Sequence, residues 1–293
     1  MAITHADVRR LPTIPMPDLT SLRRILGHRR NKIGLSILIP IVTLAVVAPW
    51  LPIPAPLETN PSATFLAPSL DHPLGTDSIG RDVFSRILTG ARTSLFVGFV
   101  ASTAAITIGM FLGTVAGFLG RAVDGVIMMI VDIFLAFPGL LLTIAMVAVF
   151  GAGLWQVILA ITISDIPRTI RLQRSLVLSL KTRPYIDAAR MAHAPTTWLL
   201  IKHVVPNTIA PMLVVAGLYM ANAILTEASL SFLGLGIVPP EPSWGNIIRE
   251  GQPYLQNAWW ISTFPGVAIV LVSVGLHFVS DGVRESLDPS MRS

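Results

Sequence analysis

Three acidic residues lie in or beside apolar runs of this 293-residue chain, and they are the first candidates for chemistry: Asp132, Asp165 and Glu227. An ionisable group in the middle of a membrane helix costs roughly 2.5–3.5 kcal/mol on insertion scales, so it needs a partner or a water-filled path. Arg168 follows Asp165 by one helical turn, and this spacing favours an ion pair over contact with a bound molecule. Asp132 can equally serve as a structural partner of a neighbouring helix.

The patterns that usually mark catalysis do not occur in the sequence. It has no Gly-x-x-x-x-Gly-Lys-Ser/Thr loop for phosphates, no His-Glu-x-x-His zinc pattern and no Gly-x-Ser-x-Gly nucleophile elbow. The chain has no cysteine, and its six histidines are scattered without the spacing of metal ligands. We therefore expect no enzyme activity, no metal and no cofactor in this chain.

Composition indicates a membrane protein. Hydrophobic residues make up 53% of the chain and charged residues 13%, and the mean hydropathy is +0.70, which is too apolar for a soluble domain of this length. The net charge of +5 could suggest nucleic acid binding. Cytoplasmic Lys and Arg explain it better, since no stripe of basic and aromatic residues appears. The expected fold is all-α, a polytopic membrane protein with six transmembrane helices.

Hydropathy divides the chain into six spans. They are expected at residues 33–50, 93–118, 126–150, 154–170, 208–235 and 261–279. The first span can also be read as a cleaved signal peptide, but Pro49 lies where a cleavage site needs small residues, so we favour an uncleaved helix. In the second span Gly109, Gly113 and Gly117 recur at every fourth residue, which predicts close packing against another helix.

Positive residues set the expected orientation. The N-terminal arm, Arg121, the 168–206 segment and Arg284 fall on one side of a six-span arrangement. That side is the cytoplasm, so both termini are expected inside. The implied divisions are a cytoplasmic arm with an amphipathic helix from Asp18 (1–32), a first helix (33–50), an extracytoplasmic loop (51–91), a transmembrane domain (92–281) with a hairpin at 182–206, and a cytoplasmic tail (282–293).

The predicted outer loops carry two further features. Residues 71–77 and 80–86 contain acids and a histidine that could bind a metal, although turn and helix-cap chemistry explains them more simply. Trp259 and Trp260 end the second outer loop at the height expected for an interfacial aromatic belt.

The most informative stretch is the polar, basic hairpin 182–206. Pro184 can open one short helix, which should end near His193 because Pro195 disfavours helical geometry at Ala194. Pro195 then opens a second helix, which Pro206 should end. Helices this short are marginal alone and need a surface to pack on.

The hairpin resembles the EAA loop of permease subunits of bacterial ABC importers. Asp187-Ala188-Ala189, His193 and Val205-Pro206-Asn207 match that motif, with Asp for the family's Glu and His for its Gly. The segments 74–92, 227–244 and 281–289 are similar to the dipeptide, oligopeptide and nickel branch. The resemblance therefore covers residues 74–289, and it implies the type I importer permease fold.

This resemblance implies a role and a set of partners. The chain would form half of the path of an ATP-driven importer in the bacterial inner membrane, for peptides or related solutes, with nickel chelates also open. A second, different permease, two ATPases that hold ATP and Mg, and an extracytoplasmic solute-binding protein would complete it. The coupling residues that contact an ATPase would be Tyr185, Asp187, Ala188, Ala189, Ala192 and His193.

Two roles remain open at particular residues. Tyr219, Asn222, Thr226 and Glu227 form a polar series on the fifth span, and they either line the translocation path or make helix–helix hydrogen bonds. His193 could sense pH, but a solvent-exposed residue at a helix C-terminus is the simpler interpretation. A standalone channel, a secondary carrier and a membrane-embedded enzyme are the rival functions, and the sequence does not identify the solute.

Overall fold

The computed structural model describes residues 27–287 and is helical throughout, apart from loops and one isolated β-bridge between Thr76 and Asp82. The helices are α2 (Arg29–Val47), α3 (Val83–Leu119), α4 (Arg121–Leu135), α5 (Gly139–Phe150), α6 (Leu154–Lys181), α7 (Pro184–Met191), α8 (Thr196–Leu199), α9 (Val205–Phe232), α10 (Trp244–Gly251) and α11 (Trp260–Leu287). Short turns are η2 (Ala48–Trp50), η3 (Pro61–Ala63), the π-helix η4 (Leu200–Val204) and η5 (Gln252–Tyr254). The all-α prediction is confirmed for this part of the chain, and the predicted amphipathic helix from Asp18 lies outside it.

Four helical stretches are long and apolar enough to cross a membrane: Arg29–Trp50, Val83–Leu119, Thr196–Phe232 and Trp260–Ser286. α4 and α5 meet that test only as a pair, and the pair is bent by 91°. The predicted third span, 126–150, is therefore a bent pair of helices, either one broken span or a re-entrant loop, and a crossing here stays a prediction. Pro138 disfavours helical geometry at the residue before it, so α4 ends at Leu135 and a new helix starts at Gly139. α6 is not among the four long apolar stretches, because it contains several charged residues, including Asp165, Arg168 and Arg171.

Several helices extend well beyond their apolar segments. α3 begins ten residues before the expected Thr93, where the Asp82 carboxylate accepts a hydrogen bond from the Ser85 N–H at 2.8 Å. α6 runs to Lys181 and α11 to Leu287, past the expected ends at 170 and 279. Hydropathy marks the part of a helix that suits lipid, whereas the backbone hydrogen bonds continue into polar residues at its ends.

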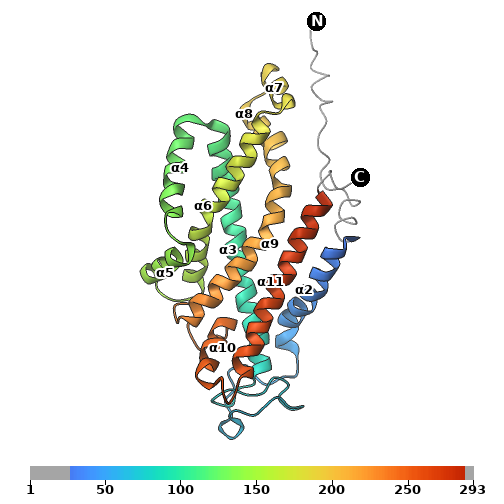
Figure 1. The fold of residues 1–293 in the computed structure, drawn as a ribbon, viewed down its shortest axis with the longest axis vertical. Coiled ribbons are helices and arrows are strands. Elements are labelled where there is room, and N and C mark those ends of the chain that lie inside the picture. The colour runs from blue at the N-terminus through green and yellow to red at the C-terminus, as the bar shows by residue number, and fades with distance from the viewer. Residues whose placement is uncertain (1–26, 288–293) are drawn as a thin grey trace.

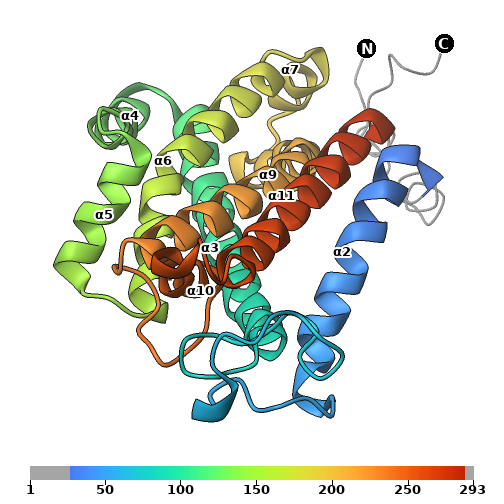
Figure 2. The ribbon, with the colours of Figure 1, turned by 60° about the horizontal axis from the view of Figure 1, so that its bottom comes forward.

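The long helices run roughly along one axis (Figure 1). The α3–α4 turn and the α7–α8 hairpin lie at one end, which we call the hairpin end, and α11 ends and α2 begins on the side of the molecule that points toward it. α10 and the 51–82 loop lie at the opposite end. From a second direction, α4 and α5 lie beside α6 at one side of the molecule and α2 lies beside α11 at the other (Figure 2).

The small-residue row of α3 lies directly against α6. A Cβ atom at Gly109 would meet the Thr169 side chain, and one at Gly113 would lie 2.6 Å from the Ile170 carbonyl oxygen. A Cβ at Gly117 would lie 2.9 Å from that of Val177. The two backbones are thus as close as glycine permits, which favours van der Waals contact where lipid supplies no hydrophobic drive.

Polar side chains join the same helices across this contact. The Thr169 hydroxyl donates to the Ala105 carbonyl at 2.9 Å. The Gln173 amide, fully buried, donates to the hydroxyls of Thr114 at 2.8 Å and Thr208 at 2.9 Å, so that it links α3, α6 and α9. Hydrogen bonds of this kind contribute modestly in a membrane but set the register of the helices.

The opposite end is closed by the 51–82 loop. The Trp260 indole donates to the Thr76 carbonyl at 3.1 Å, and Trp260 is 6% exposed. Trp260 therefore anchors the loop inside the protein, whereas the sequence predicted that it faces the membrane interface. Arg86, 1% exposed, donates to Asp77 and to Glu250, both at 2.7 Å. These contacts join the loop to α3 and α10.

The glycine contact predicts opposite effects for one substitution at two sites. Gly113→Ala should lower the thermal midpoint of the purified protein, because overpacking costs about 1–3 kcal/mol and the Ile170 carbonyl cannot move alone. Gly125→Ala on α4 is the matched control: no atom lies within 4 Å of the new Cβ, and alanine favours a helix over glycine. Thermal unfolding in detergent measures both, and equal midpoints would contradict the contact.

Candidate functional site

The hairpin forms the two short helices that its prolines predict. Pro184 is the first residue of α7, where its missing N–H removes no helical hydrogen bond. α7 ends at Met191, and α8 follows Pro195. Pro206 does not end the second helix as expected. The π-turn η4 precedes it, and α8, η4 and α9 run on without a break, since a widened turn accommodates a proline ring.

The turn between α7 and α8 is a Schellman motif with histidine in the glycine position. His193 has a φ of 56°, its N–H donates to the Arg190 carbonyl at 2.9 Å, and the Ala194 N–H donates to the Ala189 carbonyl at 3.1 Å. Glycine adopts this left-handed geometry without cost, whereas a side chain makes it less favourable. The turn therefore keeps the backbone that the motif expects, and the His193 side chain is exposed.

One face of the hairpin belongs to the core of this chain. Ile186, Ala189 and Leu199 are at most 2% exposed, and they pack in one cluster with Phe118 of α3 and Val177 of α6. Ala189 is therefore buried inside this chain, where it packs with its own neighbours, and its role in contacting a partner stays a prediction. The spacing of the alanines predicts a helix face of small side chains, but it does not say which surface packs against that face.

Charges and rings hold the base of the hairpin. The Lys181 ammonium donates to the Phe118 carbonyl at 2.8 Å, where it offsets the negative end of α3. The Arg190 guanidinium lies 5.6 Å from the Phe118 ring centroid. The Tyr185 ring lies 5.9 Å from the ring of His203, and burial raises the pKa of its phenol above the ordinary value. Tyr185 is thus half-buried and neutral, a packing residue more than a surface one.

The opposite face of the hairpin is open. Asp187, Met191, Ala192 and His193 are exposed, and Ala188 is half-buried. The Met191 side chain is 75% exposed, and Asp187 forms a loose pair with Arg190 at 3.5 Å. Of the six predicted coupling residues, the structure brings Asp187, Ala192 and His193 fully to the surface and places Ala188 at its edge.

The polar series on α9 divides into two sides. Glu227 is fully buried, and it accepts hydrogen bonds from the hydroxyls of Ser94 and Ser231, both at 2.8 Å. Ser94 belongs to α3, so these bonds join two helices. Asn222 is exposed and Tyr219 and Thr226 are half-exposed. Glu227 therefore lies apart from the other three residues.

A small polar cavity of about 90 Å³ lies between α5, α6 and α9. Its polar lining comes from Thr143, Ser164, Asp165, Arg168 and Thr226. The Thr143 hydroxyl donates to that of Ser164 at 3.0 Å. Tyr219 lies close enough to Asp165 and Arg168 to interact with their charges. Hydroxyls and charges from three helices thus meet at one point inside the bundle.

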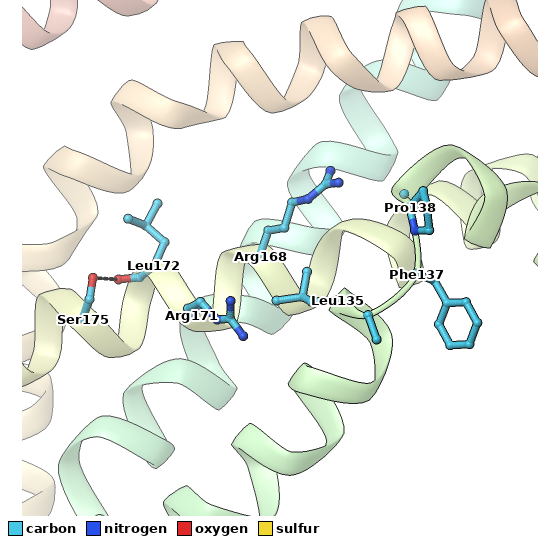
Figure 3. A pocket seen from close by; sticks show the side chains of 9 residues that line it. Leu135, Phe137, Pro138, Arg168, Arg171, Leu172 and Ser175 are labelled. Carbon is cyan, nitrogen blue, oxygen red and sulfur yellow. Dashed lines mark hydrogen bonds between the residues drawn. The ribbon is translucent and has the colours of Figure 1, made fainter.

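A larger, open cavity of about 840 Å³ adjoins it at the bend between α4 and α5. Figure 3 shows the lining side chains, with Arg168 and Arg171 extending from α6 and Phe137 and Pro138 at the bend. Arg171 pairs with Asp132, and Arg174 pairs with Asp124, so α6 is tied to α4 twice. The Arg168–Asp165 pair is present at 3.3 Å, as its spacing predicted.

Sequence reasoning missed part of this constellation. Thr143 lies in an apolar run without a charged neighbour that would have marked it, and Ser164 was overlooked beside Asp165. Only the bend at Pro138 brings α5 to α6. Arg168 was considered only as a partner of Asp165 and as one of the positive charges of the 168–206 segment. The sequence placed it near the end of a span at 154–170, whereas the structure places it at the middle of the 28-residue α6.

The acid and histidine cluster of the 51–82 loop has a structural role. Asp82 caps α3, and it also contacts the His72 ring nitrogen Nδ1 at 2.9 Å. Asp77 accepts hydrogen bonds from its own turn and from Arg81 and Arg86. In the described residues, no group of three or more His, Asp or Glu side chains is arranged as a metal site. The capping interpretation is confirmed for Asp82.

Curated relatives match nearly the whole chain. A putative peptide transport system permease protein of Brucella abortus is 40% identical over 276 residues, 94% of this chain and 93% of that protein. The dipeptide transport system permease protein DppC of Alkalihalophilus pseudofirmus is 43% identical, covering 90% and 88%. The oligopeptide transport system permease protein OppC of Bacillus subtilis is 39% identical, covering 92% and 89%.

A solved structure shares the fold. A chain of the inward-facing MetNI methionine ABC transporter superposes with a TM-score of 0.59 at 19% identity, covering 70% of this chain and 98% of that one. The family described as binding-protein-dependent transport system inner membrane component matches residues 83–293. The chain is therefore a transport permease and not an enzyme, and it belongs to the family of inner membrane components of binding-protein-dependent transport systems.

Proposed function

We propose that this chain is one permease subunit of an ATP-driven importer of dipeptides or oligopeptides. The observation that carries this proposal is the 39–43% identity, over nine-tenths of the chain, to permeases named for dipeptide and oligopeptide transport. A second permease, two ATPases and a solute-binding protein complete the importer. Nickel chelates stay a secondary candidate from the resemblance of the sequence alone.

The proposed topology has six crossings with both termini inside. The four long apolar stretches, the bent α4–α5 pair and α6 supply six segments, and their alternating direction supports it (Figure 1). Arg81 and Arg86 belong to the end opposite the hairpin, which the positive-inside rule expects to be poor in Lys and Arg. Ion pairs with Asp77 and Glu250 neutralise both. The remaining positive charge gathers toward the hairpin end. Cytoplasmic loops of membrane proteins are rich in Lys and Arg, so we assign the hairpin end to the cytoplasm.

The proposed coupling surface is the open face of the hairpin. Its buried face is packed on α3 and α6, so a push on Asp187, Ala192 or His193 moves those helices as a unit. The sequence has no phosphate-binding loop, so nucleotide hydrolysis must come from another subunit. A packed lever of this kind suits rigid-body rocking between outward and inward openings.

The proposed translocation path follows Tyr219, Asn222 and Thr226 on α9 toward the polar cavity beside α5 and α6. These residues are at least partly exposed, and Thr226 reaches the cavity wall. Glu227 leaves the path and serves as a buried acceptor between helices. The second permease would close the open side.

Because the chain has no cysteine, single cysteines can test its topology. Thr196→Cys at the hairpin should react with a membrane-impermeant maleimide in inside-out vesicles and stay unlabelled in right-side-out vesicles. Leu70→Cys in the fully exposed part of the 51–82 loop should show the reverse. Labelling of both from the same side would contradict the proposed topology.

The coupling surface predicts a site-specific loss of transport. Ala192→Glu should reduce peptide uptake at least about tenfold in the assembled importer, because a large charge enters a docking contact between small residues. Ala122→Glu, an exposed alanine beside the α3–α4 turn, is the matched control and should keep most of the uptake. ATP hydrolysis, uptake and retention of the ATPases are measured together. Equal uptake by both variants would argue against docking at this face.

The division of the α9 polar series predicts different defects on its two sides. Asn222→Leu and Thr226→Val should lower uptake several-fold while the thermal midpoint stays near that of the parent. Glu227→Leu should lower the midpoint, because Ser94 and Ser231 lose a buried acceptor at a cost of about 1–3 kcal/mol. Full uptake in both Asn222→Leu and Thr226→Val would show that this face of α9 does not line the translocation path.

A further inference from the structure

Arg168 is not explained by helix packing, unlike the two arginines that follow it on α6. Arg171 pairs with Asp132 and Arg174 with Asp124, so each ties α6 to α4. Arg168 instead pairs with Asp165 of its own helix, three residues away and at 3.3 Å. An ion pair within one helix joins no two elements, and apolar residues could replace it without loss of stability.

The position of Arg168 along α6 is the second observation. Arg168 is at the middle of the 28-residue α6, ~20 Å from either end at 1.5 Å per residue. An arginine among the helices of a membrane protein normally faces a protein-lined or water-filled space. The Arg168 side chain is 49% exposed, whereas that of Asp165 is 11% exposed. The guanidinium therefore has open space before it.

That space is suited to a small solute. The cavity of about 840 Å³ at the α4–α5 bend and the polar cavity of about 90 Å³ share Arg168 and Gly139 in their walls. Cavities of a few hundred to a thousand Å³ are typical of ligand sites. Gly139 makes room for the guanidinium, since a Cβ there would lie 2.7 Å from Nη2. Figure 3 shows the Arg168 side chain extending from α6 between the surrounding helices.

The donor set defines the ligand chemistry. A guanidinium carries five N–H donors in a planar fork that matches a carboxylate. In the described part of the chain one of them is used, by Nη1 toward Asp165. The hydroxyls of Thr143 and Thr226 and the Asp165 carboxylate line the adjoining wall, where their oxygens can accept hydrogen bonds from peptide N–H groups. The other four donors of Arg168 have no hydrogen-bond partner among the described residues, and the side chain is half-exposed.

We propose that Arg168 binds the free C-terminal carboxylate of the peptide midway along the path, with Asp165 as the positioning residue that holds the guanidinium. This inference rests on the proposed function, because it assigns a recognition site within that path. It predicts that the permease itself distinguishes peptides with a free carboxylate from those without one.

The test uses the assembled importer in proteoliposomes, without the solute-binding protein, and Leu140→Cys in the wall of the polar cavity as a reporter in this cysteine-free chain. The rate of its modification by methyl methanethiosulfonate is followed by mass spectrometry of this subunit. L-alanyl-L-alanine and its N-acetyl derivative, which both keep the carboxylate, should slow the modification at least about threefold. L-alanyl-L-alaninamide should not slow it.

Second variants separate recognition from folding. Arg168→Gln should abolish the difference between acid and amide, and Arg168→Lys should retain part of it. Arg171→Gln removes a neighbouring arginine and can change the rate, but it should keep the difference. Equal protection by acid and amide in the parent, protection by the acid that survives Arg168→Gln, or a reporter that never reacts would each overturn the proposal.

The proposed function is tested apart from this inference. The parent importer, with its binding protein, is assayed for ATP-dependent uptake of a mixture of di- and tripeptides. If peptides are taken up but the Arg168 substitutions do not change how strongly the peptide acid and the peptide amide protect the reporter, the function is retained and the carboxylate site is rejected. A lack of peptide uptake would reject the function itself.

Discussion

The close contact between α3 and α6 is the constraint on which the other features depend. Glycines on α3 bring its backbone against Thr169, Ile170 and Val177, and Gln173 then bonds to both α3 and α9. Any side chain larger than hydrogen in that row would separate the helices. The hairpin core and the polar cavity are both built on α6, so both would move with it.

The same helix carries three kinds of contact along its length. Near the hairpin end, Val177 and Lys181 support α7 through Phe118. Between that end and the middle, Arg171 and Arg174 hold α4 through ion pairs. At the middle, Arg168 opens onto the cavities. A helix arranged in this way connects a surface at one end of the molecule to a cavity in its interior without any long loop, because packed helices move as rigid bodies.

Much of the fold was predictable from the residues. Helix class, the glycine row and the start of the hairpin at Pro184 follow from local rules of backbone geometry and hydropathy. The ends of α3, α6 and α11 were not, since helical hydrogen bonding continues into polar residues that hydropathy ignores. The burial of Ala189 in this chain could not be predicted either, because a helix face of small residues can pack on the chain's own core as well as on a partner.

The sequence by itself determined that this is a multi-span helical membrane protein with no phosphate-binding loop pattern, and it contains a hairpin that resembles the EAA loop. Composition, motif absence and proline positions are local properties and need no coordinates. The tertiary structure decided which side of each helix faces inward. It placed Glu227 in a buried contact, turned Asp187 and His193 to the surface, and gathered Thr143, Asp165, Arg168 and Thr226 around one cavity. Such choices depend on the rotation and bending of helices far apart in the chain, and no single segment contains that information.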